Sequence, residues 1–398
     1  MRRLRSRSPA VLAAALVALA ACRIVRAPPP APATTPERAL EELAPEKFPA
    51  FADDLDYSGL DEAIERSLVS FARVAIADPG RTLAFGKERV PAARVVATLR
   101  RFRELAQARP TPAALSDALR REFRVFRSTG DGRGEVLFTG YYLPELAGSL
   151  TREGPYQFPL HRAPDDLVQV RARDFPALSE DLVGRVENGR LVPYPTRAEI
   201  ARGALDGRNA ELAWVASPVE AFFAEIQGSG ILRLPDGTSR VVTYAGKNGQ
   251  RYGAVGAELV RRGALKREDV SMQAIKAWLA ANPADAPLVL ETNPSYVFFR
   301  FADAPTGALG LPVTPDRTIA ADARVFPKGA LAFVETERPV DAAGGPFRPF
   351  SRFMLDQDAG GAVKTSAHVD FFFGSGAYAE SAAGRMKQPG RLYYLLLR

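Results

Sequence analysis

The sequence predicts a mainly β protein that opens with helices, and three observations support this fold class. Several stretches before residue 130 carry apolar side chains at helical spacing. The run Glu135–Tyr142 is apolar and aromatic and is followed by Pro144, which is typical of a strand and its end. After the apolar run Tyr296–Phe299, the chain divides into short apolar segments separated by Gly and Pro, a pattern that suits a small β-barrel.

The first element is a predicted leader peptide at residues 1–22. Four arginines precede the apolar stretch Ala10–Ala21, which is too short to cross a bilayer as a helix but has the proportions of a signal peptide. The stretch ends in Leu19-Ala20-Ala21-Cys22, a bacterial lipoprotein cleavage pattern in which the cysteine is lipidated. Cys22 is the only cysteine of the chain, and lipidation accounts for this unpaired thiol. The alternative is an ordinary exported protein that is cleaved nearby and loses Cys22.

The residues after the cysteine predict where the protein is anchored. Arg23 follows Cys22, and the absence of Asp at that position favours the outer membrane. Several acyl chains on Cys22 would hold the protein in the lipid of that membrane, facing the periplasm, without a transmembrane helix. Residues 23–48 are rich in Pro and Ala and are predicted to form an extended tether to the folded part.

Residues 49–143 are predicted to hold three helices and the first part of the barrel. Apolar residues recur at helical spacing over Leu60–Ala77, Val95–Leu105 and Leu115–Phe126. Thr111 followed by Pro112 is a start signal for the third helix.

Residues 144–300 mix strands with helices. A hairpin is predicted over Ile231–Tyr244, because two β-type runs flank the turn residues Pro235-Asp236-Gly237. Two helices are predicted, at Val255–Gly263 and at Ser271–Ala281. Ser271 is the predicted N-cap of the second. The remaining residues, 301–398, hold the other strands of the predicted barrel.

Composition narrows the chemistry. The chain has 53 Lys and Arg against 46 Asp and Glu, a net charge of +7, without a long basic run or basic–aromatic alternation, so no nucleic acid partner is expected. His161 and His368 are its only histidines and no thiol is left after lipidation, which argues against zinc and thiol chemistry. No G-x-S-x-G motif supports a serine nucleophile. Carboxylates remain as the acid–base groups, and neither a metal nor a cofactor is expected.

The densest group of chemically active residues lies between positions 358 and 374. Asp358 precedes the paired glycines that begin at Gly360, which permit a close backbone approach. Asp370 lies inside an apolar run that is predicted to be a largely buried strand, where partial desolvation favours a protonated carboxyl. Lys364 opposes this effect if it lies close. The alternative is that Asp370 faces solvent at a strand end and Asp358 only stabilises a turn.

Six motifs run in order through the second part of the chain. They are Phe138–Tyr142, Gln227–Gly230, Tyr244–Gly249, Ser271–Ile275, Asn293–Phe299 and Asp358–Gly374. In this order they resemble the membrane-bound lytic transglycosylase A (MltA) family, and the match runs from about Glu135 to the C-terminus. The last part also resembles the three-aspartate domain of that family, with Asp322, Asp358 and Asp370 at the three positions.

The resemblance implies a double-psi β-barrel that carries the active site and includes the N-terminal helices and residues 301–398. It also implies that residues 144–300 form an inserted second β-rich domain, with a glycan lying in the groove between the two domains. Asp370 matches the catalytic aspartate of the family, and Asp358 matches a neighbouring aspartate that shapes the site. The family usually has Gly where Thr365 stands, which leaves loop details open.

The implied activity is cleavage of the β-1,4 bond between N-acetylmuramic acid and N-acetylglucosamine in peptidoglycan. A glycoside hydrolase usually needs two carboxylates. In a lytic transglycosylase the C6 hydroxyl of the muramic acid attacks its own anomeric carbon and leaves a 1,6-anhydro end. Because this attack is intramolecular, it is favoured in entropy and one acid is sufficient. Asp370 would donate a proton to the glycosidic oxygen and then accept one from the attacking hydroxyl.

Other residues are candidates for binding substrate or shaping the site. They are Asp358, Asp322, Lys364, Gly360, Thr139, Tyr141, Gln227, Ser229, Tyr244 and Asn248. Plainer interpretations exist, with Tyr141 in the strand core, Gln227 in a turn and Asn248 in an ordinary loop.

Two other functions are consistent with parts of the sequence. A non-catalytic peptidoglycan-binding lipoprotein would keep the groove but release no product. A carboxylate protease is suggested by Asp358-Ala359-Gly360, but that chemistry needs two carboxylates sharing a proton and no second copy of the motif occurs. The expected partners are therefore peptidoglycan glycan strands and outer-membrane lipid, with cell-wall synthesis or division proteins as further candidates.

Overall fold

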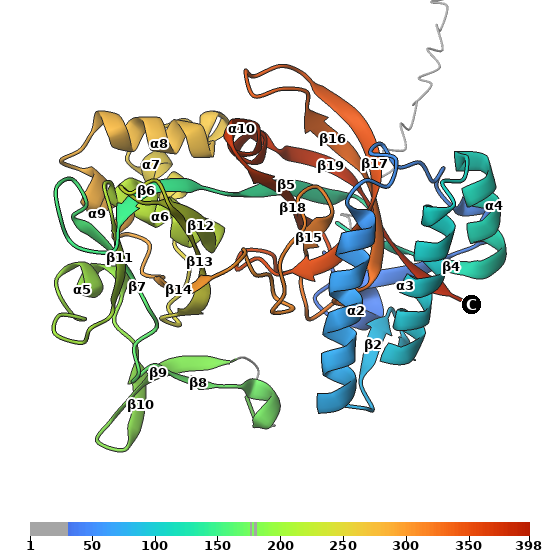
Figure 1. Cartoon of the computed structure of the whole chain (residues 1–398), viewed down its shortest axis with the longest axis horizontal. Coiled ribbons are helices and arrows are strands. Elements are labelled where there is room, and N and C mark those ends of the chain that lie inside the picture. The colour runs from blue at the N-terminus through green and yellow to red at the C-terminus, as the bar shows by residue number, and fades with distance from the viewer. Residues whose placement is uncertain (1–30, 176, 179–180) are drawn as a thin grey trace, which may run out of the picture.

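The structure is a computed structural model that describes residues 31–175, 177–178 and 181–398. The predicted signal peptide, Cys22 and the first residues of the predicted tether lie outside this range. Figure 1 shows two lobes side by side, one that contains both the N-terminal helices and the last strands of the chain, and one formed by the middle of the chain. Among the described helices, none combines the length and apolar character that crossing a bilayer requires.

The first elements of the described chain belong to the lobe that holds the C-terminus. They are α1 (Pro36–Ala39), β1 (Leu40–Leu43), the 3₁₀ helix η1 (Pro45–Lys47), α2 (Leu60–Ala77), β2 (Thr82–Phe85), β3 (Glu88–Pro91), α3 (Ala92–Gln107), α4 (Pro112–Glu122) and β4 (Phe123–Ser128). The predicted start of the third helix is confirmed, because the side chain of Thr111 accepts a hydrogen bond from the Ala114 N–H at 3.2 Å and Pro112 takes the first helical position.

Six strands of the same lobe close into a barrel. They are β5 (Val136–Leu143), β15 (Thr318–Ala320), β16 (Leu331–Pro339), β17 (Phe347–Asp358), β18 (His368–Ser375) and β19 (Lys387–Leu397). The order around the ring is β5, β19, β16, β17, β15 and β18, and the parallel pairing of β18 with β5 closes it. β4 and β1 extend the sheet from β19, and the helix α10 (Ala377–Arg385) connects β18 with β19.

One apolar core unites the barrel with the N-terminal helices. Phe102 of α3 and Phe353 of β17 are fully buried, and their ring centroids lie 4.5 Å apart. Phe333 of β16 packs on the same Phe353 ring at 4.8 Å. Burying a side chain of this size contributes about 1.5–3 kcal/mol. The helices therefore complete the barrel core, and Figure 1 shows α2, α3 and α4 on the same side of the lobe.

The second lobe is built around a sheet of six strands in the order β14, β13, β12, β6, β11, β7. Its strands are β6 (Glu145–Ser149), β7 (Phe158–His161), β11 (Glu211–Val215), β12 (Ser229–Arg233), β13 (Ser239–Lys247) and β14 (Val297–Ala302). A separate sheet comprises β8 (Val168–Val170), β9 (Leu182–Glu187) and β10 (Arg190–Pro193). The helices are η2 (Ala172–Asp174), α5 (Arg197–Ala201), α6 (Pro218–Gln227), α7 (Val255–Arg261), η3 (Arg267–Asp269), α8 (Met272–Ala281) and α9 (Ala286–Leu290).

Three predictions for this lobe are confirmed. The predicted hairpin is the antiparallel pair β12 and β13, and the two predicted helices are α7 and α8. The hydroxyl of Ser271 caps α8 by accepting a hydrogen bond from the Ala274 N–H at 3.1 Å.

The two lobes are joined covalently and by side chains. β5 of the barrel runs into β6 of the second lobe with only Pro144 between them. Between α8 and α10, the Lys276 ammonium forms an ion pair with Glu380 at 2.5 Å and donates a hydrogen bond to the Tyr142 hydroxyl at 3.1 Å. The connecting strand is therefore attached to both lobes.

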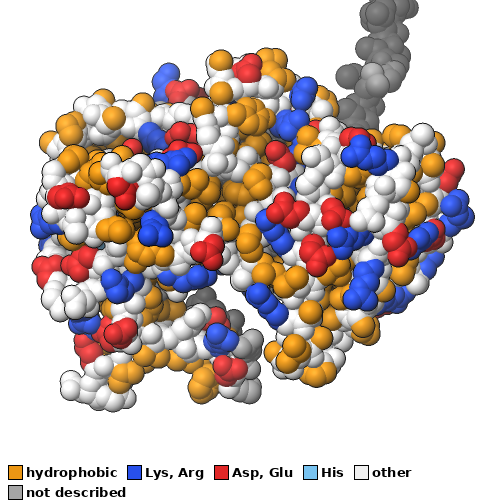
Figure 2. All heavy atoms as spheres, viewed as in Figure 1, with side chains coloured by type: hydrophobic (Ala, Val, Ile, Leu, Met, Phe, Trp, Pro, Cys, Tyr) orange, Lys and Arg blue, Asp and Glu red, His pale blue; other side chains and the backbone are white. Residues whose placement is uncertain are grey.

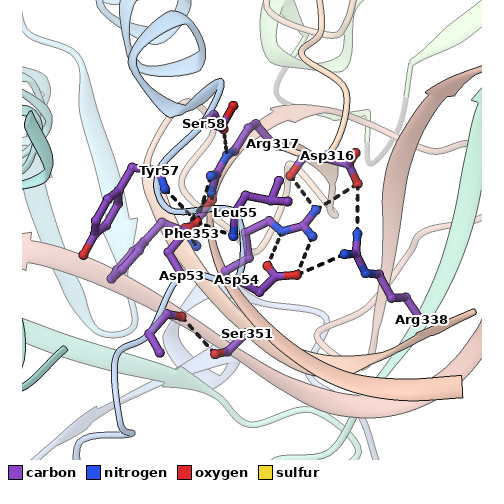
Figure 3. Close-up of polar contacts among 12 residues, drawn as sticks. Asp53, Asp54, Leu55, Tyr57, Ser58, Asp316, Arg317, Arg338, Ser351 and Phe353 are labelled. Atoms are coloured by element: carbon purple, nitrogen blue, oxygen red, sulfur yellow. Dashed lines mark hydrogen bonds and ion pairs between the residues drawn. The ribbon is translucent and has the colours of Figure 1, made fainter. Parts of the chain in front are cut away.

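Figure 3 shows how the segment before α2 is held to the barrel by buried arginines. Arg317 donates to both carboxylate oxygens of Asp53, at 2.6 and 2.8 Å. Arg352 pairs with Asp54 at 2.7 Å and with Asp316 at 2.8 Å. Both arginine side chains have no exposed surface. The pairs Arg317–Asp53 and Arg352–Asp54 join residues 264 and 298 positions apart, so the N-terminal segment is part of the barrel fold.

The predicted tether is wrong from Ala33 onward. The Ala33 N–H donates to the Ser366 hydroxyl at 2.8 Å, and the Ala33 carbonyl accepts from the Ser366 N–H at 2.9 Å. Leu40–Leu43 forms β1, which pairs with β4. Leu40 and Leu43 are buried in the core of the barrel lobe. The apolar residues of this Pro- and Ala-rich stretch therefore pack into the fold.

The third predicted helix ends earlier than its apolar spacing indicated. α4 stops at Glu122, and Phe123 and Phe126 lie in β4, where both are buried. Residues three positions apart share a helix face, but a strand that is covered on both faces also buries them. The spacing of Phe123 and Phe126 alone therefore could not distinguish a helix from a strand.

The prediction of mostly short C-terminal strands is also wrong. β16, β17 and β19 have 9, 12 and 11 residues, and α10 was not predicted. Pro389 and Gly390 lie inside β19, at the point where it leaves β5 and begins to pair with β16. A Cβ on Gly390 would lie 2.4 Å from the Glu335 carbonyl oxygen, so glycine permits this crossing and does not end the strand.

Candidate active site

Asp370 lies on the face of β18 opposite to the apolar core. Its neighbours Val369 and Phe371 are fully buried, and the period of two turns Asp370 to the other face. In the sheet Asp370 is in register with Thr139 of β5 and with Ala320 of β15. The Asp370 side chain is 21% exposed. It is therefore neither fully buried in the strand nor fully exposed to solvent.

The partners of Asp370 are a hydroxyl and an imidazole. The Thr139 hydroxyl donates a hydrogen bond to Asp370 Oδ1 and lies 2.7 Å from His368 Nε2. The same His368 nitrogen lies 3.4 Å from Asp370 Oδ1. Among the ion pairs of the described residues, none joins Asp370 to a Lys or Arg, which leaves the carboxyl without a permanent cation.

Asp358, the last residue of β17, is held more tightly. Its Oδ2 accepts a hydrogen bond from the Tyr141 hydroxyl at 2.8 Å, and its Oδ1 accepts from the N–H groups of Ala308 and Ala359 at 3.1 and 2.8 Å. Burial raises the pKa of Asp358, although the Tyr141 hydrogen bond acts in the opposite direction. Burial also raises the pKa of Tyr141 well above its ordinary value, so the phenol stays the donor.

Gly360 brings the loop after β17 against Asp370. A Cβ at this position would lie 3.0 Å from Asp370 Oδ2 and 2.8 Å from the Val363 side chain. Any larger residue would therefore move the loop or the carboxyl. The predicted residues Thr139, Tyr141, Asp358, Gly360 and Asp370 thus lie close together, on β5, β17, β18 and the loop after β17.

Asp322 and Lys364 are tied to Arg324. Arg324 forms an ion pair with Asp322 at 2.6 Å and donates to the Lys364 carbonyl at 2.6 Å, while the Lys364 side chain is exposed. Burial raises the pKa of Asp322, but the Arg324 hydrogen bonds outweigh it and hold the pKa below its ordinary value. Neither side chain has a contact with Asp370 among the described interactions. Through Arg324, Asp322 is linked to the backbone at Lys364.

Comparison with known proteins identifies the family. Residues 137–300 match the family model described as the MltA specific insert domain, and residues 317–396 match that of the 3D domain. The membrane-bound lytic murein transglycosylase A of Vibrio cholerae is 35% identical over 272 residues, which are 67% of each chain. The chain belongs to the MltA family of enzymes.

Solved structures of MltA proteins share the fold. The membrane-bound lytic murein transglycosylase from Agrobacterium tumefaciens superposes with a TM-score of 0.73 at 31% identity, over 90% of this chain and 98% of that one. The Escherichia coli MltA structure with bound chitohexaose superposes with a TM-score of 0.67 at 27% identity, over 92% and 95% of the two chains.

Three candidate residues of the MltA insert region lie on or beside the central sheet. Gln227 ends α6, and its side-chain oxygen accepts from the Tyr142 N–H at 3.0 Å, which ties the insert to β5. The Ser229 and Thr243 hydroxyls are 2.9 Å apart on paired strands. Tyr244 is 47% exposed on β13 and is available to a ligand. Among the described contacts, none joins these residues directly to Asp370.

Asn248, predicted to bind substrate or shape the site, is a buried residue of the loop after β13. Asn248 has no exposed surface, and its amide nitrogen donates to the carbonyls of Pro195 and Pro294 at 2.8 and 2.9 Å. Its amide oxygen accepts from the Tyr296 N–H at 2.9 Å. Because both ends of the amide are used, Asn248 braces the loop after β13.

His368 was not identified from the sequence as a neighbour of Asp370. The available signal was spacing, because His368 and Asp370 are two apart in a strand and must share a face. Thr139 was identified by resemblance, but its contact with both residues is decided by the parallel pairing of β5 with β18. Among the described residues, no group of three or more His, Cys, Asp or Glu could hold a metal ion.

Proposed function

We propose that the chain is a peptidoglycan lytic transglycosylase with Asp370 as its only catalytic acid. It cleaves the β-1,4 bond between N-acetylmuramic acid and N-acetylglucosamine and forms 1,6-anhydro-N-acetylmuramic acid. Membership of the MltA family supports the reaction class. The observation that carries the residue assignment concerns the aspartate trio. Within the described part of the chain, Asp370 is the one member that is partly exposed and has neither an arginine partner nor a backbone donor.

The surroundings of Asp370 support a proton transfer in both directions. The protonated carboxyl donates to the glycosidic oxygen as the bond breaks. The resulting carboxylate then accepts the proton of the C6 hydroxyl, which attacks the anomeric carbon. A lysine or arginine beside Asp370 would hold it ionised and oppose the first step. The Thr139 hydroxyl and the His368 ring can stay beside Asp370 in both its protonated and its ionised state.

The commitment of Asp358 supports a reaction with one acid. A nucleophilic or water-activating carboxylate must be free to approach the anomeric carbon or a water. Both oxygens of Asp358 already accept hydrogen bonds from Tyr141, Ala308 and Ala359. Asp358 is therefore assigned to holding the loop beside Asp370, and the substrate supplies the nucleophile.

The proposal includes the finer fold and the path of the glycan. The six-stranded ring is assigned as a double-psi β-barrel comprising residues 49–143 and 301–398, and residues 144–300 are assigned as the inserted domain. The glycan would lie between the two lobes, where Figure 2 shows a hollow. Tyr244 would then offer an exposed ring to a sugar, and the chitohexaose complex of the E. coli relative supports a glycan ligand.

Digestion of purified sacculi tests this function. Soluble muropeptides analysed by mass spectrometry should carry 1,6-anhydro ends with the unmodified protein and be almost absent with Asp370→Asn. Asp117→Asn, which changes an exposed aspartate on α4, is the matched control and should digest normally. Reducing ends would indicate hydrolysis, and binding of sacculi without soluble products would select the non-catalytic lipoprotein.

The membrane anchor is a separate part of the proposal. Cys22 is lipidated and holds the protein in the outer membrane with the catalytic lobe in the periplasm; the relatives named membrane-bound support association with a membrane. Metabolic labelling with a fatty-acid analogue and membrane fractionation should place the label in the outer-membrane fraction. Cys22→Ser should lose both the label and that location. A labelled Cys22→Ser variant would contradict the assignment.

A further inference from the structure

Three polar groups form a hydrogen-bonded chain on the outer face of β5 and β18. The Thr139 hydroxyl stands between His368 Nε2, at 2.7 Å, and Asp370 Oδ1. The same three residues are fixed by the parallel register that sets His368 beside Leu137 and Asp370 beside Thr139. The side chains of His368 and Asp370 are 24% and 21% exposed, so the chain is only partly shielded from solvent.

The chain has a direction, because a threonine hydroxyl carries a single hydrogen. In one direction His368 Nε2–H donates to Thr139, and Thr139 donates to Asp370 Oδ1. In the other, Asp370 donates from Oδ1 to Thr139, and Thr139 donates to an unprotonated His368 Nε2. In the first direction Oδ1 accepts a hydrogen bond, so the acidic proton of Asp370 is on Oδ2. In the second direction the acidic proton is on Oδ1.

Geometry favours the first direction. His368 Nε2 lies 3.4 Å from Asp370 Oδ1, so an N–H on that nitrogen also faces the carboxylate oxygen. Without this hydrogen, the lone pair of Nε2 would face the negative oxygen at the same distance, which is unfavourable whenever Asp370 is ionised. The first direction is stable in both states of Asp370, whereas the second requires its proton on Oδ1.

The other oxygen, Oδ2, borders the loop at Gly360. A Cβ at this position would lie 3.0 Å from Oδ2, so glycine keeps this side of the carboxyl uncrowded. We infer that His368 is a positioning residue which, through Thr139, holds Oδ1 as an acceptor and makes Oδ2 the oxygen that delivers and recovers the proton. This inference rests on the proposed transglycosylase reaction.

The proton balance closes on Oδ2. The Oδ2 proton moves to the glycosidic oxygen as the bond from the anomeric carbon to that oxygen breaks. The C6 oxygen forms the new bond to the anomeric carbon, and its proton moves to Oδ2. Between the two steps, Oδ1 carries negative charge stabilised by the Thr139 hydroxyl, which His368 polarises. His368 and Thr139 are unchanged at the end.

The neighbouring ionisable groups do not compete for Oδ1. Tyr141 and Asp358 border the same site, and they hydrogen-bond to each other at 2.8 Å. Asp356 lies further inside, where Lys328 and Tyr394 hold its carboxylate. The direction of the chain is therefore decided by His368 and Thr139.

Nitrogen NMR of the histidine rings tests this direction without using activity. The chain has only two histidines, so ¹⁵N-histidine labelling gives two ring systems, which His368→Gln assigns. Burial lowers the pKa of His161 to about 4, so that ring is a neutral reference at pH 7. We expect hydrogen on Nε2 of His368 at all pH values at which the protein is folded. A neutral His368 with hydrogen only on Nδ1 would overturn the inference.

Kinetics with sacculi provide the second test. Thr139→Val removes the hydroxyl at nearly constant volume and should lower kcat by on the order of 10²-fold with little change in KM. Thr139→Ser should recover most of that loss. His368→Phe should lower kcat in the same way. His368→Gln keeps a hydrogen-bond donor and should lower kcat less. An active unmodified protein whose Thr139→Val variant keeps its kcat would refute the inference alone, whereas an inactive unmodified protein would refute the transglycosylase proposal.

Discussion

The carboxylates beside the N-terminal segment and the carboxylate of Asp370 belong to the same barrel but have different partners. Asp53 is buried against the fully buried guanidinium of Arg317 (Figure 3), with its side chain only 1% exposed. Asp370 is partly exposed and is held by the Thr139 hydroxyl and the His368 ring. One carboxylate is fixed in its charged state, and the other retains access to solvent and to a ligand.

The difference teaches what separates an aspartate that holds the fold from one that can transfer a proton. A buried carboxylate needs a permanent cation, because an unpaired buried charge is strongly unfavourable. A general acid must avoid such a cation, because it would keep the group ionised. The same residue type therefore takes either role according to its partners, and exchanging or removing those partners tests the comparison.

The largest effect is expected on activity at Asp370. Asp370→Asn should lower the rate of murein cleavage by about 10²–10⁴-fold, because the amide cannot donate an acidic proton or accept one back. The free energy of unfolding should change by less than about 1 kcal/mol, since the side chain is partly exposed and its partners are polar. Turnover assays and urea denaturation measure the two quantities. A large loss of stability would place Asp370 with the structural aspartates.

The next effect is expected on stability at the buried pair. Arg317→Met should lower the free energy of unfolding by about 3–5 kcal/mol, because it leaves Asp53 buried without its cation. The double variant Asp53→Asn with Arg317→Met should be more stable than Arg317→Met alone. Urea denaturation followed by circular dichroism measures this difference. Equal stabilities for the single and double variants would show that the buried charge is not the cause.

Asp53 and Asp358, two aspartates that hold the fold with different partners, should differ in the sign of their pH dependence. At Asp53 burial raises the pKa, but Arg317 outweighs it and holds the pKa below its ordinary value of 3.8. The stability that Asp53 contributes is therefore present above about pH 3.8 and is lost as the pH falls through the lower folded-state pKa. At Asp358 burial raises the pKa above 3.8, so its contribution is lost as the pH rises through the folded-state value.

Unfolding measured from about pH 2 to pH 7 checks these opposite signs. Asp53→Asn should flatten the decrease in stability at the acid end, relative to the unmodified protein. Asp358→Asn should leave that decrease in place and gain stability relative to the unmodified protein as the pH rises. Curves that shift in the same direction for both variants would contradict the assigned pKa directions.

The smallest effect is expected at the ion pair between the two lobes. Lys276 and Glu380 are 28% and 45% exposed, so water and salt screen their attraction. Lys276→Gln should reduce the free energy of unfolding by less than about 1 kcal/mol, and the difference should shrink at high salt. A loss of unfolding free energy as large as that of Arg317→Met would mean that solvent exposure does not explain the difference between this ion pair and the buried pair of Asp53 and Arg317.

Local patterns predicted those parts of the fold that local interactions decide. The N-caps Thr111 and Ser271 and the hairpin around Asp236 could be found because each depends on residues within a few positions. Phe123 was misplaced because its burial depends on β19, which lies almost at the other end of the chain. The long strand β19 was divided too early, because only the crossing with β16 explains Gly390.

By itself the sequence determined the order of the motifs, the apolar run around Asp370 and the family, because these are written in consecutive residues. Tertiary structure decided the surroundings of the other aspartates, since the partners of Asp53, Asp358 and Asp370 come together only when the barrel closes. Thr139 and Asp370 are 231 positions apart, yet the pairing of two strands places them in contact. A carboxyl group's chemistry depends on the groups within a few ångströms, and those groups are chosen by the fold.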